Sequence, residues 1–354
     1  MSAAAEYGLA LSYLNLYKNE AVNGKGGDNV GEVFGNQKLS DVETNTSVWE
    51  HFEWTHDEQL EVQQSLKKLE DRCQIDPALQ KFQVKQDDDA WNGFYSHHAT
   101  SFFKDRHYLH TAFPHEFGRT MSDKDPHQEE NEATLTPQPE IVEEKTLVEV
   151  GCGVGNALLP LLEEEQSDKN NSQHQARTTR RIRWTVHGLD LSSVAIALLK
   201  NDPRFLRPAE EGRAYAYVAN IVQGIPSTCH DVADVASLLF CLSAIDPTLQ
   251  ATAINHVVSS LKPEGVIVFR DYGRWDESQV KLGSQRSKRL KRDFYQKNDG
   301  TKCYFFSTRD LRELFEEQCG LEVVELEYIN RIYKNRATDA SRRRVWVHGR
   351  FRKR

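Results

Sequence analysis

The sequence predicts an α/β protein built on a mostly parallel, doubly wound sheet. Three observations support this: a strand that runs into a glycine-rich turn at residues 145–156, a second strand that ends in Asp190, and the alternation of β-prone and helical segments from there to residue 318. Alternating strands and helices place helices on both faces of a parallel sheet. The 354 residues suffice for one enlarged domain or two small ones.

The first strand, Lys145–Val150, carries Glu149 near its end and leads through the turn into a helix-forming stretch, Ala157–Leu162. Three glycines occupy alternate positions of the turn: Gly151, Gly153 and Gly155. Glycine is needed where a backbone turns sharply or approaches a ligand, and this unit is the usual cradle for a nucleotide. Asn156 stands where a dinucleotide fingerprint has its third glycine. The pattern therefore favours adenosine with an amino-acid tail, S-adenosylmethionine (SAM), although a tight turn without a ligand stays open.

The second strand, Ile182–Asp190, is followed by Ser192, a suitable N-cap for a helix over Ser193–Lys200. A carboxylate at the tip of this strand in a doubly wound sheet can accept both hydroxyls of an adenosine ribose. Glu149 and Asp190 would then flank one glycine turn. The alternative is that Asp190 only caps a helix or a loop.

The remaining elements continue the alternation. We expect strands at Arg213–Asn220, Val232–Leu242 and Gly265–Arg270, helices at Thr248–Leu261 and Ser307–Gln318, and final strands at Leu321–Ile332 and Val345–Phe351. Two strands in succession predict an antiparallel edge hairpin, with the last strand antiparallel to the rest. This order is that of a class I SAM-dependent methyltransferase, which has a Rossmann-like sheet.

Composition favours a soluble, cytoplasmic enzyme. No apolar run approaches the ~20 residues of a membrane span, and the N-terminal residues lack the basic-then-apolar pattern of a secretion or import signal. The six cysteines form no C-x-x-C pair and lie mostly in apolar segments, so we expect buried thiols and neither a disulfide framework nor a metal site.

Charge is distributed unevenly, which points to nucleic acid. From Arg270 onward the chain carries 22 basic and 13 acidic residues, although its net charge is −8. Basic runs interleaved with Trp346 and Phe351 suit a phosphate backbone with stackable bases, whereas an ordinary solvated surface is the alternative. The candidate RNA-binding residues of this part are Arg270, Lys288, Arg289, Lys291, Arg292, Arg343 and Arg344.

The chain divides into four parts by composition. We expect a disordered tail over residues 1–30, an aromatic and basic extension over 31–120, an acidic linker over 121–145, and the catalytic domain over 146–354. A second polar loop is predicted for Glu163–Arg181. The extension is interpreted either as an aromatic mini-core or as a lid that brings Trp91 and Tyr95 to the cofactor and four residues to the RNA: Phe103, Lys104, Arg106 and His107.

Several strings together resemble one family. They are Phe34-Gly35-Asn36, the segment Trp49–Trp54, Trp91-x3-Tyr95, Phe102-Phe103-Lys104-Asp105-Arg106-His107, the glycine turn, Leu242-Ser243-Ala244-Ile245, Phe269–Gly273 and Asp299–Phe306. The chain resembles the tRNA 3-methylcytidine methyltransferases of the methyltransferase-like and Trm-one-forty group, in the branch that modifies threonine-type tRNAs. The resemblance implies SAM as cofactor and cytidine 32 of the tRNA anticodon stem-loop as target, with serine or arginine tRNAs and a synthetase or accessory protein left open.

The resemblance also implies the residues that contact SAM: Trp91, Tyr95, Gly151, Asp190, Asn220, Ile221 and Leu239. One departure is Asn220-Ile221, where the family usually has Asp-Leu. An Asn carbonyl can still accept a hydrogen bond from the adenine amino group, with less charge assistance.

Methylation at cytosine N3 requires no general base from the protein. The nitrogen carries an in-plane lone pair and no proton, so positioning should supply most of the acceleration. Methylation turns the neutral cytosine into a cation, so the carboxylate of Asp271 near the base would favour the developing charge. The alternatives are that Asp271 pairs with Arg270 or caps a turn. Arg106 and His107 are the other candidate catalytic residues. Competing functions are methylation of a protein or small molecule and a catalytically silent RNA-binding module.

Overall fold

The computed structural model describes residues 47–53, 55–72, 87–100, 103–118, 141–163, 180–285, 288–335 and 340–354. The predicted tail over residues 1–30, the Phe34–Asn36 string and most of the predicted linker and polar loop lie outside these residues. So does Trp54.

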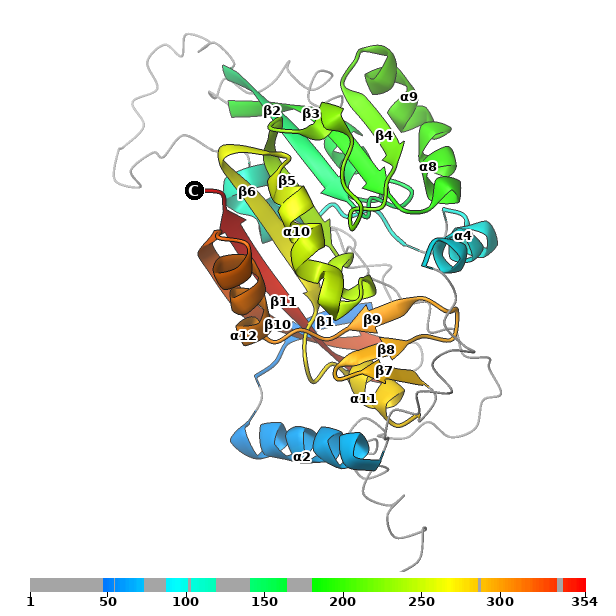
Figure 1. Ribbon diagram of the computed structural model, residues 1–354, viewed down its shortest axis with the longest axis vertical. Helices are drawn as coiled ribbons and strands as arrows, with labels where there is room; N and C mark the ends of the chain where they lie inside the picture. Colours follow the sequence, from blue (N-terminus) through cyan, green and yellow to red (C-terminus); the bar gives the residue numbers. More distant parts are fainter. Residues whose placement is uncertain are drawn as a thin grey trace, which may run out of the picture.

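An eight-stranded sheet forms the centre of the molecule (Figure 1). Its order is β1 (Ser47–His51), β10 (Glu322–Asn335), β11 (Ala340–Arg352), β6 (Leu261–Tyr272), β5 (Ala233–Leu239), β2 (Ile141–Val150), β3 (Arg180–Asp190) and β4 (Ala214–Val218). The five strands from β4 to β6 are parallel, and β11 runs antiparallel beside β6. This confirms the doubly wound α/β fold with an antiparallel last strand.

The predicted C-terminal hairpin is antiparallel, but it does not form the edge of the sheet. β11 inserts between β6 and β10, and Val345, Val347 and Phe351 are buried there. β1 then pairs along the outer side of β10. The edge prediction was wrong for residues 331–335 of β10, which pair with β1 from the N-terminal extension; this pairing does not extend to residues 322–330.

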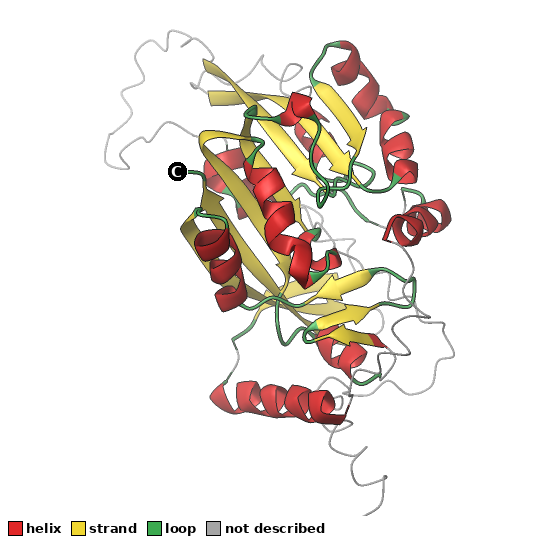
Figure 2. Cartoon of the chain, viewed as in Figure 1, coloured by secondary structure: helices red, strands yellow, loops and turns green. Residues whose placement is uncertain are grey.

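Helices cover both faces of the sheet, as expected from the alternation (Figure 2). On one face α10 (Gln250–Val258), α12 (Thr308–Arg312) and the π-helical turn Glu313–Gln318 pack on β5, β6 and β11. The opposite face carries the short helices α5 (Leu109–Ala112) and α6 (Pro114–Phe117), a helix over residues 158–163, and α8 (Ser193–Lys200) with α9 (Pro203–Glu210). The sheet is therefore buried on both sides.

Local sequence signals explain several element ends. Ser192 accepts the Ala195 amide as the N-cap of α8, and Ser307 forms a capping box with Asp310 at the start of α12. α10 stops at Val258, before the predicted end, because β6 already begins at Leu261. β2 begins at Ile141, so the last five residues of the predicted linker belong to the sheet, where they pair with β3.

Three further elements lie around the carboxyl ends of the strands. α4 (Asp87–His98) packs on α8 through Phe94 and Tyr95, and α2 (His56–Arg72) packs on α11 (Glu277–Gly283) through Val62 and Val280. A small antiparallel sheet consists of β7 (Arg289–Lys291), β8 (Phe294–Gln296) and β9 (Lys302–Tyr304). We refer to residues 289–304 as the flap.

Two negative findings concern the described residues only. Among them, no helix is both long and apolar enough to cross a membrane. The same residues contain no group of three or more His, Cys, Asp or Glu side chains that could hold a metal ion.

Candidate functional site

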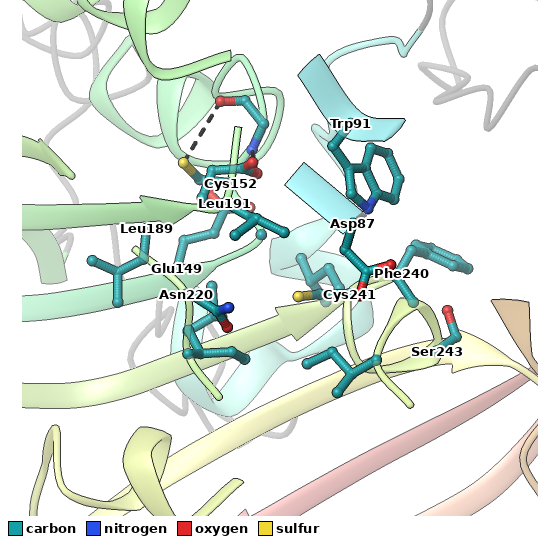
Figure 3. A pocket seen from close by; sticks show the side chains of 18 of the residues that line it. Asp87, Trp91, Glu149, Cys152, Leu189, Leu191, Asn220, Phe240, Cys241 and Ser243 are labelled. Atoms are coloured by element: carbon teal, nitrogen blue, oxygen red, sulfur yellow. Dashed lines mark hydrogen bonds between the residues drawn. The ribbon is translucent and has the colours of Figure 1, made fainter. Parts of the chain in front are cut away.

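A pocket of ≈ 210 Å³ opens at the carboxyl ends of β2, β3, β4 and β5 (Figure 3). In an open α/β sheet this is the expected place for a ligand. The wall opposite the strands is made by α4, by residues 103–106 and by the flap. Segments from the N-terminal extension and from the C-terminal half therefore close over one strand-end site.

The glycine turn forms the floor of this pocket. Gly151 and Gly153 have φ values of 70° and 55°, a left-handed conformation that favours glycine. A Cβ on Gly153 would lie 2.4 Å from the Tyr95 hydroxyl, and one on Gly151 would lie 2.6 Å from the sulfur of Cys241. Gly155 does not line the pocket, because a Cβ there would meet Leu159 and Leu199 in the helices behind the turn. Its predicted cofactor contact is thereby corrected to a packing role.

Asp190 lies at the tip of β3, as the sequence predicted. Its carboxylate accepts the Gly153 amide on one oxygen and the Ser192 amide on the other, both at 2.8 Å. Burial raises the pKa of Asp190 to about 6, and these two amides oppose the rise. The side chain thus joins the glycine turn to the start of α8 and keeps further lone pairs for ribose hydroxyls.

Glu149 is a buried acid beside the same turn. Its residue is 3% exposed, and Oε2 has no hydrogen-bond partner. Burial raises the pKa of Glu149 to about 8, with Arg106 opposing the rise and Asp190 adding to it. A buried oxygen without a hydrogen-bond partner is unfavourable, so we expect a ligand in the pocket to supply the partner. A cationic group of the ligand would also stabilise the ionised carboxylate.

Three residues named from the resemblance line the adenosine side of the pocket. Asn220 and Ile221 follow β4, and Leu239 ends β5. The Asn220 Oδ1 accepts the Val222 amide at 3.0 Å, so one lone pair of this oxygen is used within its own turn. The other is available to an adenine amino group, as the sequence suggested for an Asn at this place.

α4 forms a lid over the turn. Trp91 and Tyr95 line the pocket from one face of the helix, with ring centroids 6.1 Å apart. Asn92 fixes the helix to α8, because its Oδ1 accepts the Ser192 hydroxyl at 2.8 Å. Asp87, one turn before Trp91, also lines the pocket and forms an ion pair of 2.7 Å with Lys302 of the flap.

The segment 103–107 is anchored to the glycine turn by Asn156. The Asn156 amide group donates to the Phe103 carbonyl and to Asp105, both at 3.1 Å, and the Arg106 amide donates to the Asn156 carbonyl at 2.6 Å. Asn156, noted in the sequence as a departure from a dinucleotide motif, thus ties this segment down. Phe103 and Arg106 line the pocket, whereas Lys104 and His107 do not.

Arg106 lies between the cofactor end and the flap end of the pocket. Its guanidinium donates to the Leu239 carbonyl at 3.2 Å and lies 5.4 Å from the ring centroid of Phe240. A role of Arg106 near the reacting base stays a prediction.

Asp271 does not face the pocket. It is 0% exposed, and its carboxylate accepts the Ser243 and Tyr272 amides, each at 2.9 Å. Burial raises its pKa to about 6. These contacts agree with the turn-capping alternative for Asp271, whereas a contact between Asp271 and the base stays a prediction.

Several predicted RNA contacts have partners inside the protein. Arg270 and Arg344 are buried: Arg270 contacts His348 and covers the Tyr108 ring, and Arg344 pairs with Asp276 at 2.9 Å. Arg343 pairs with Glu58 at 3.0 Å, and Lys291 pairs with Asp246 at 2.6 Å. Burial excludes Arg270 and Arg344 from a free RNA surface in this conformation.

The remaining basic candidates lie at the flap and the surface. Lys104 and Arg292 are exposed, whereas Lys288 and Arg289 are half-buried. None of the four lines the pocket. Contact of these four residues with RNA stays a prediction.

The sequence analysis missed part of the pocket. Phe240, Cys241 and Tyr272 line it from the sheet, and Lys297 and Lys302 line it from the flap. Lys297 lies 6.0 Å from the ring centroid of Trp91. The string Asp299–Phe306 was noticed only as part of a resemblance, and no residue pattern indicated that Lys302 within it and Lys297 just before it line the site.

The donor and acceptor groups fit SAM. Asp190 is placed for a ribose, Asn220 for an adenine, and the unpaired oxygen of Glu149 for a cationic amino-acid tail. The left-handed glycines bring the backbone of the turn to the surface of the pocket. Trp91 and Tyr95 can cover the tail from the lid.

Comparisons with known proteins agree with this geometry. The sequence model described as a methyltransferase domain matches residues 126–326. The tRNA N(3)-cytidine methyltransferase METTL2 of Danio rerio is 32% identical over 87% of this chain and 84% of its own length, and the tRNA N(3)-methylcytidine methyltransferase Mettl2 of Drosophila melanogaster is 30% identical over 87% and 83%. The tRNA(Thr) (cytosine(32)-N(3))-methyltransferase of Saccharomyces cerevisiae is 30% identical over 90% of this chain and 45% of its own. The chain belongs to the methyltransferase family of the tRNA N(3)-cytidine methyltransferases.

Proposed function

We propose that this protein transfers the methyl group of SAM to N3 of cytidine 32 in the anticodon loop of tRNA, with threonine tRNAs as substrates and serine or arginine tRNAs as further candidates. The observation that carries the proposal is one continuous pocket, which runs from the adenosine-binding strand tips to an aromatic and basic chamber under the flap. The relatives named as cytidine N3-methyltransferases of tRNA support the choice of substrate.

The strand order lays the cofactor out along the pocket. Asn220 follows β4, Asp190 ends β3 and Glu149 lies at the end of β2, and these strands are neighbours in that order. Adenine, ribose and amino-acid tail would therefore occupy successive strand tips. The pocket continues past β5 to Phe240, Tyr272 and Lys297, which leaves this end for the methyl acceptor.

Bound SAM supplies an electrophilic methyl group, and the protein's own residues position the acceptor. Cytosine N3 needs no general base, so no proton-transfer residue is required at the pocket. Holding the reacting atoms in line converts a bimolecular step into an effectively unimolecular one. Arg106 is suited to this positioning, because its guanidinium is fixed by the Leu239 carbonyl and remains at the pocket wall.

The location of N3 explains a loop target. This atom lies on the Watson–Crick edge, so the base must be unpaired and turned out of its stack to enter the pocket. Lys104 and Arg292 are exposed, Lys288 and Arg289 are half-buried, and in this proposal these residues contact phosphates of the loop or stem. We place the reaction in the cytoplasm, with an aminoacyl-tRNA synthetase or accessory protein as a candidate partner.

Methyl transfer from labelled SAM to bulk tRNA, followed by nucleoside analysis, tests the proposal. We expect label in 3-methylcytidine, and no label in a threonine tRNA transcript that carries uridine at position 32. Label in protein and none in tRNA would support the protein-substrate alternative. SAM binding measured on the same preparation identifies a silent module if neither binding nor transfer occurs.

A further inference from the structure

Phe240 has a backbone conformation that is unusual for an aromatic residue. Its φ is 58°, in the left-handed region that bulky side chains rarely adopt. The residue follows directly on β5, next to Leu239, and lines the pocket. Conformations of this kind persist only where the surroundings enforce them, and they concentrate at functional sites.

The surroundings of Phe240 enforce this conformation. The Phe240 amide donates to the Arg270 carbonyl at 2.7 Å, which holds the backbone against β6. The carbonyl of the same peptide group, that of Leu239, accepts the Arg106 guanidinium at 3.2 Å. The peptide group that precedes the Phe240 Cα is thus restrained at both its N–H and its C=O.

The left-handed bend determines where the ring lies. Leu238 and Leu239 are buried, as is usual for the end of a central strand, whereas Phe240 is half-buried and turned into the pocket on the side of Trp91 and Asp87 (Figure 3). Tyr272 and Trp346 meet the ring edge-on, with centroids 5.4 and 6.1 Å away. The ring is therefore fixed in orientation by its neighbours.

We propose that Phe240 is the residue on which the target cytosine stacks, and that its left-handed backbone exists to present the ring to the base. The inference rests on the proposed function. Phe240 lies beyond Glu149 and the glycine turn in the strand order, where the pocket continues past the amino-acid tail of the cofactor. Aromatic faces hold unstacked bases in proteins that read single-stranded RNA.

Arg106 complements this aromatic surface. Its guanidinium lies over the Phe240 ring, 5.4 Å from the centroid, and both residues line the pocket. A planar guanidinium can donate to the O2 carbonyl of a cytosine or stack with its face. Phe240 would then fix the plane of the base while Arg106 fixes its rotation within the plane, which brings N3 in line with the methyl group.

The test compares Phe240→Leu with Phe240→Tyr, which keeps an aromatic face. In single-turnover methylation of tRNA, loss of base–aromatic stacking is expected to slow Phe240→Leu by roughly 5- to 150-fold, while Phe240→Tyr stays within a few-fold of the parent. SAM affinity, measured by calorimetry, is expected to remain unchanged in both. Tyr215→Leu, an exposed aromatic position on the edge strand β4, serves as the matched control and should keep the parental rate.

A second variant separates stacking from folding. Glycine adopts a left-handed φ without a steric cost, so the Phe240→Gly protein should not unfold at a lower temperature than Phe240→Leu. Methylation by Phe240→Gly should nevertheless remain slow, because the aromatic ring is missing. A fluorescent cytidine analogue at the target position should be quenched on binding to the parent and to Phe240→Tyr, and should stay bright with Phe240→Leu and Phe240→Gly.

Three outcomes contradict the inference. A parental rate in Phe240→Leu and Phe240→Gly, or equal quenching in all variants, would show that the base does not stack on Phe240 while leaving the proposed function intact. A loss of SAM affinity in proportion to the rate would assign Phe240 to the cofactor instead. If the parent protein transfers no methyl group to tRNA, the proposed function fails, and the base-stacking role fails with it.

Discussion

Replacing Glu149 by Gln is expected to change how stability depends on pH. Burial raises the pKa of Glu149 from 4.5 to about 8, a difference of about 3.5 units. Each unit corresponds to about 1.4 kcal/mol between the two protonation states. At pH 7 the unfolded carboxyl is ionised and the folded one is mostly protonated, so this group alone costs roughly 3 kcal/mol of stability relative to pH 4.5.

The sign follows from proton binding. The folded-state pKa lies above the unfolded one, so the contribution of Glu149 is fully present below about pH 4.5 and is lost as the pH rises through about 8. Within this window the folded state holds one more proton than the unfolded state, and stability falls by about 1.4 kcal/mol per pH unit. Asp190, with a pKa of about 6, contributes mainly in the lower part of the window.

Denaturant unfolding at pH 6.5, 7.0 and 7.5 isolates the effect of Glu149. The neutral amide of Glu149→Gln removes the slope, so the free energy of unfolding of the variant minus that of the parent should grow by about 1.2 kcal/mol across this range. Glu317→Gln, at an exposed position of the π-helical turn, should give a constant difference. A difference for Glu149→Gln that does not change with pH would show that Glu149 is ionised in the folded protein.

Three more predictions concern the cofactor and the RNA. Asp190→Ala should weaken SAM binding by about 1–3 kcal/mol, the usual cost of stranding buried polar partners, and calorimetry that shows unchanged affinity in a folded variant would remove Asp190 from the site. Asn220→Asp should bind SAM at least as tightly as the parent, because the second carboxylate oxygen stays available after the first accepts the Val222 amide; a marked loss in the same titration would mean that Asn220 does not face the adenine amino group. Neutralising Arg292 should weaken tRNA binding and flatten its dependence on salt, whereas Lys291→Ala should do less, because Lys291 is less exposed and pairs with Asp246 at 2.6 Å, a shorter contact than the 3.5 Å between Arg292 and Asp293; equal slopes for parent and both variants in a salt series would make these residues ordinary solvated surface.

The cofactor half of the site could be predicted from the sequence because its signals are local. Gly151 and Gly153 adopt the left-handed turn that their residue type indicates, and Asp190 ends a strand whose apolar run predicted it. The fold followed for the same reason: most of the strands and helices are long enough to show their periodicity. The alternation of strands and helices then indicated a mostly parallel sheet with helices on both faces.

The acceptor half could not be predicted because its determinants are not local. A positive φ at Phe240 has no residue-type signal, and the three-residue strands of the flap are too short to show a period of two. Charge counts also mislead about RNA contacts. Arg344 belongs to a basic run, yet it is buried against Asp276, which lies 68 residues away in the sequence.

The pairing of β1 with β10 has a consequence for the order in which the sheet can form during synthesis. Ser47 opposes Asn335, so the strand that is synthesised first closes the sheet only after the last strands exist. Until then β1 has no partner among the described strands, and without β1 the backbone of residues 331–335 at the end of β10 would lose its strand partner on the outer side. Such an edge is a template for pairing with another chain. N-terminal truncation beyond His51 should therefore promote self-association, even though every cofactor-contacting strand remains in place.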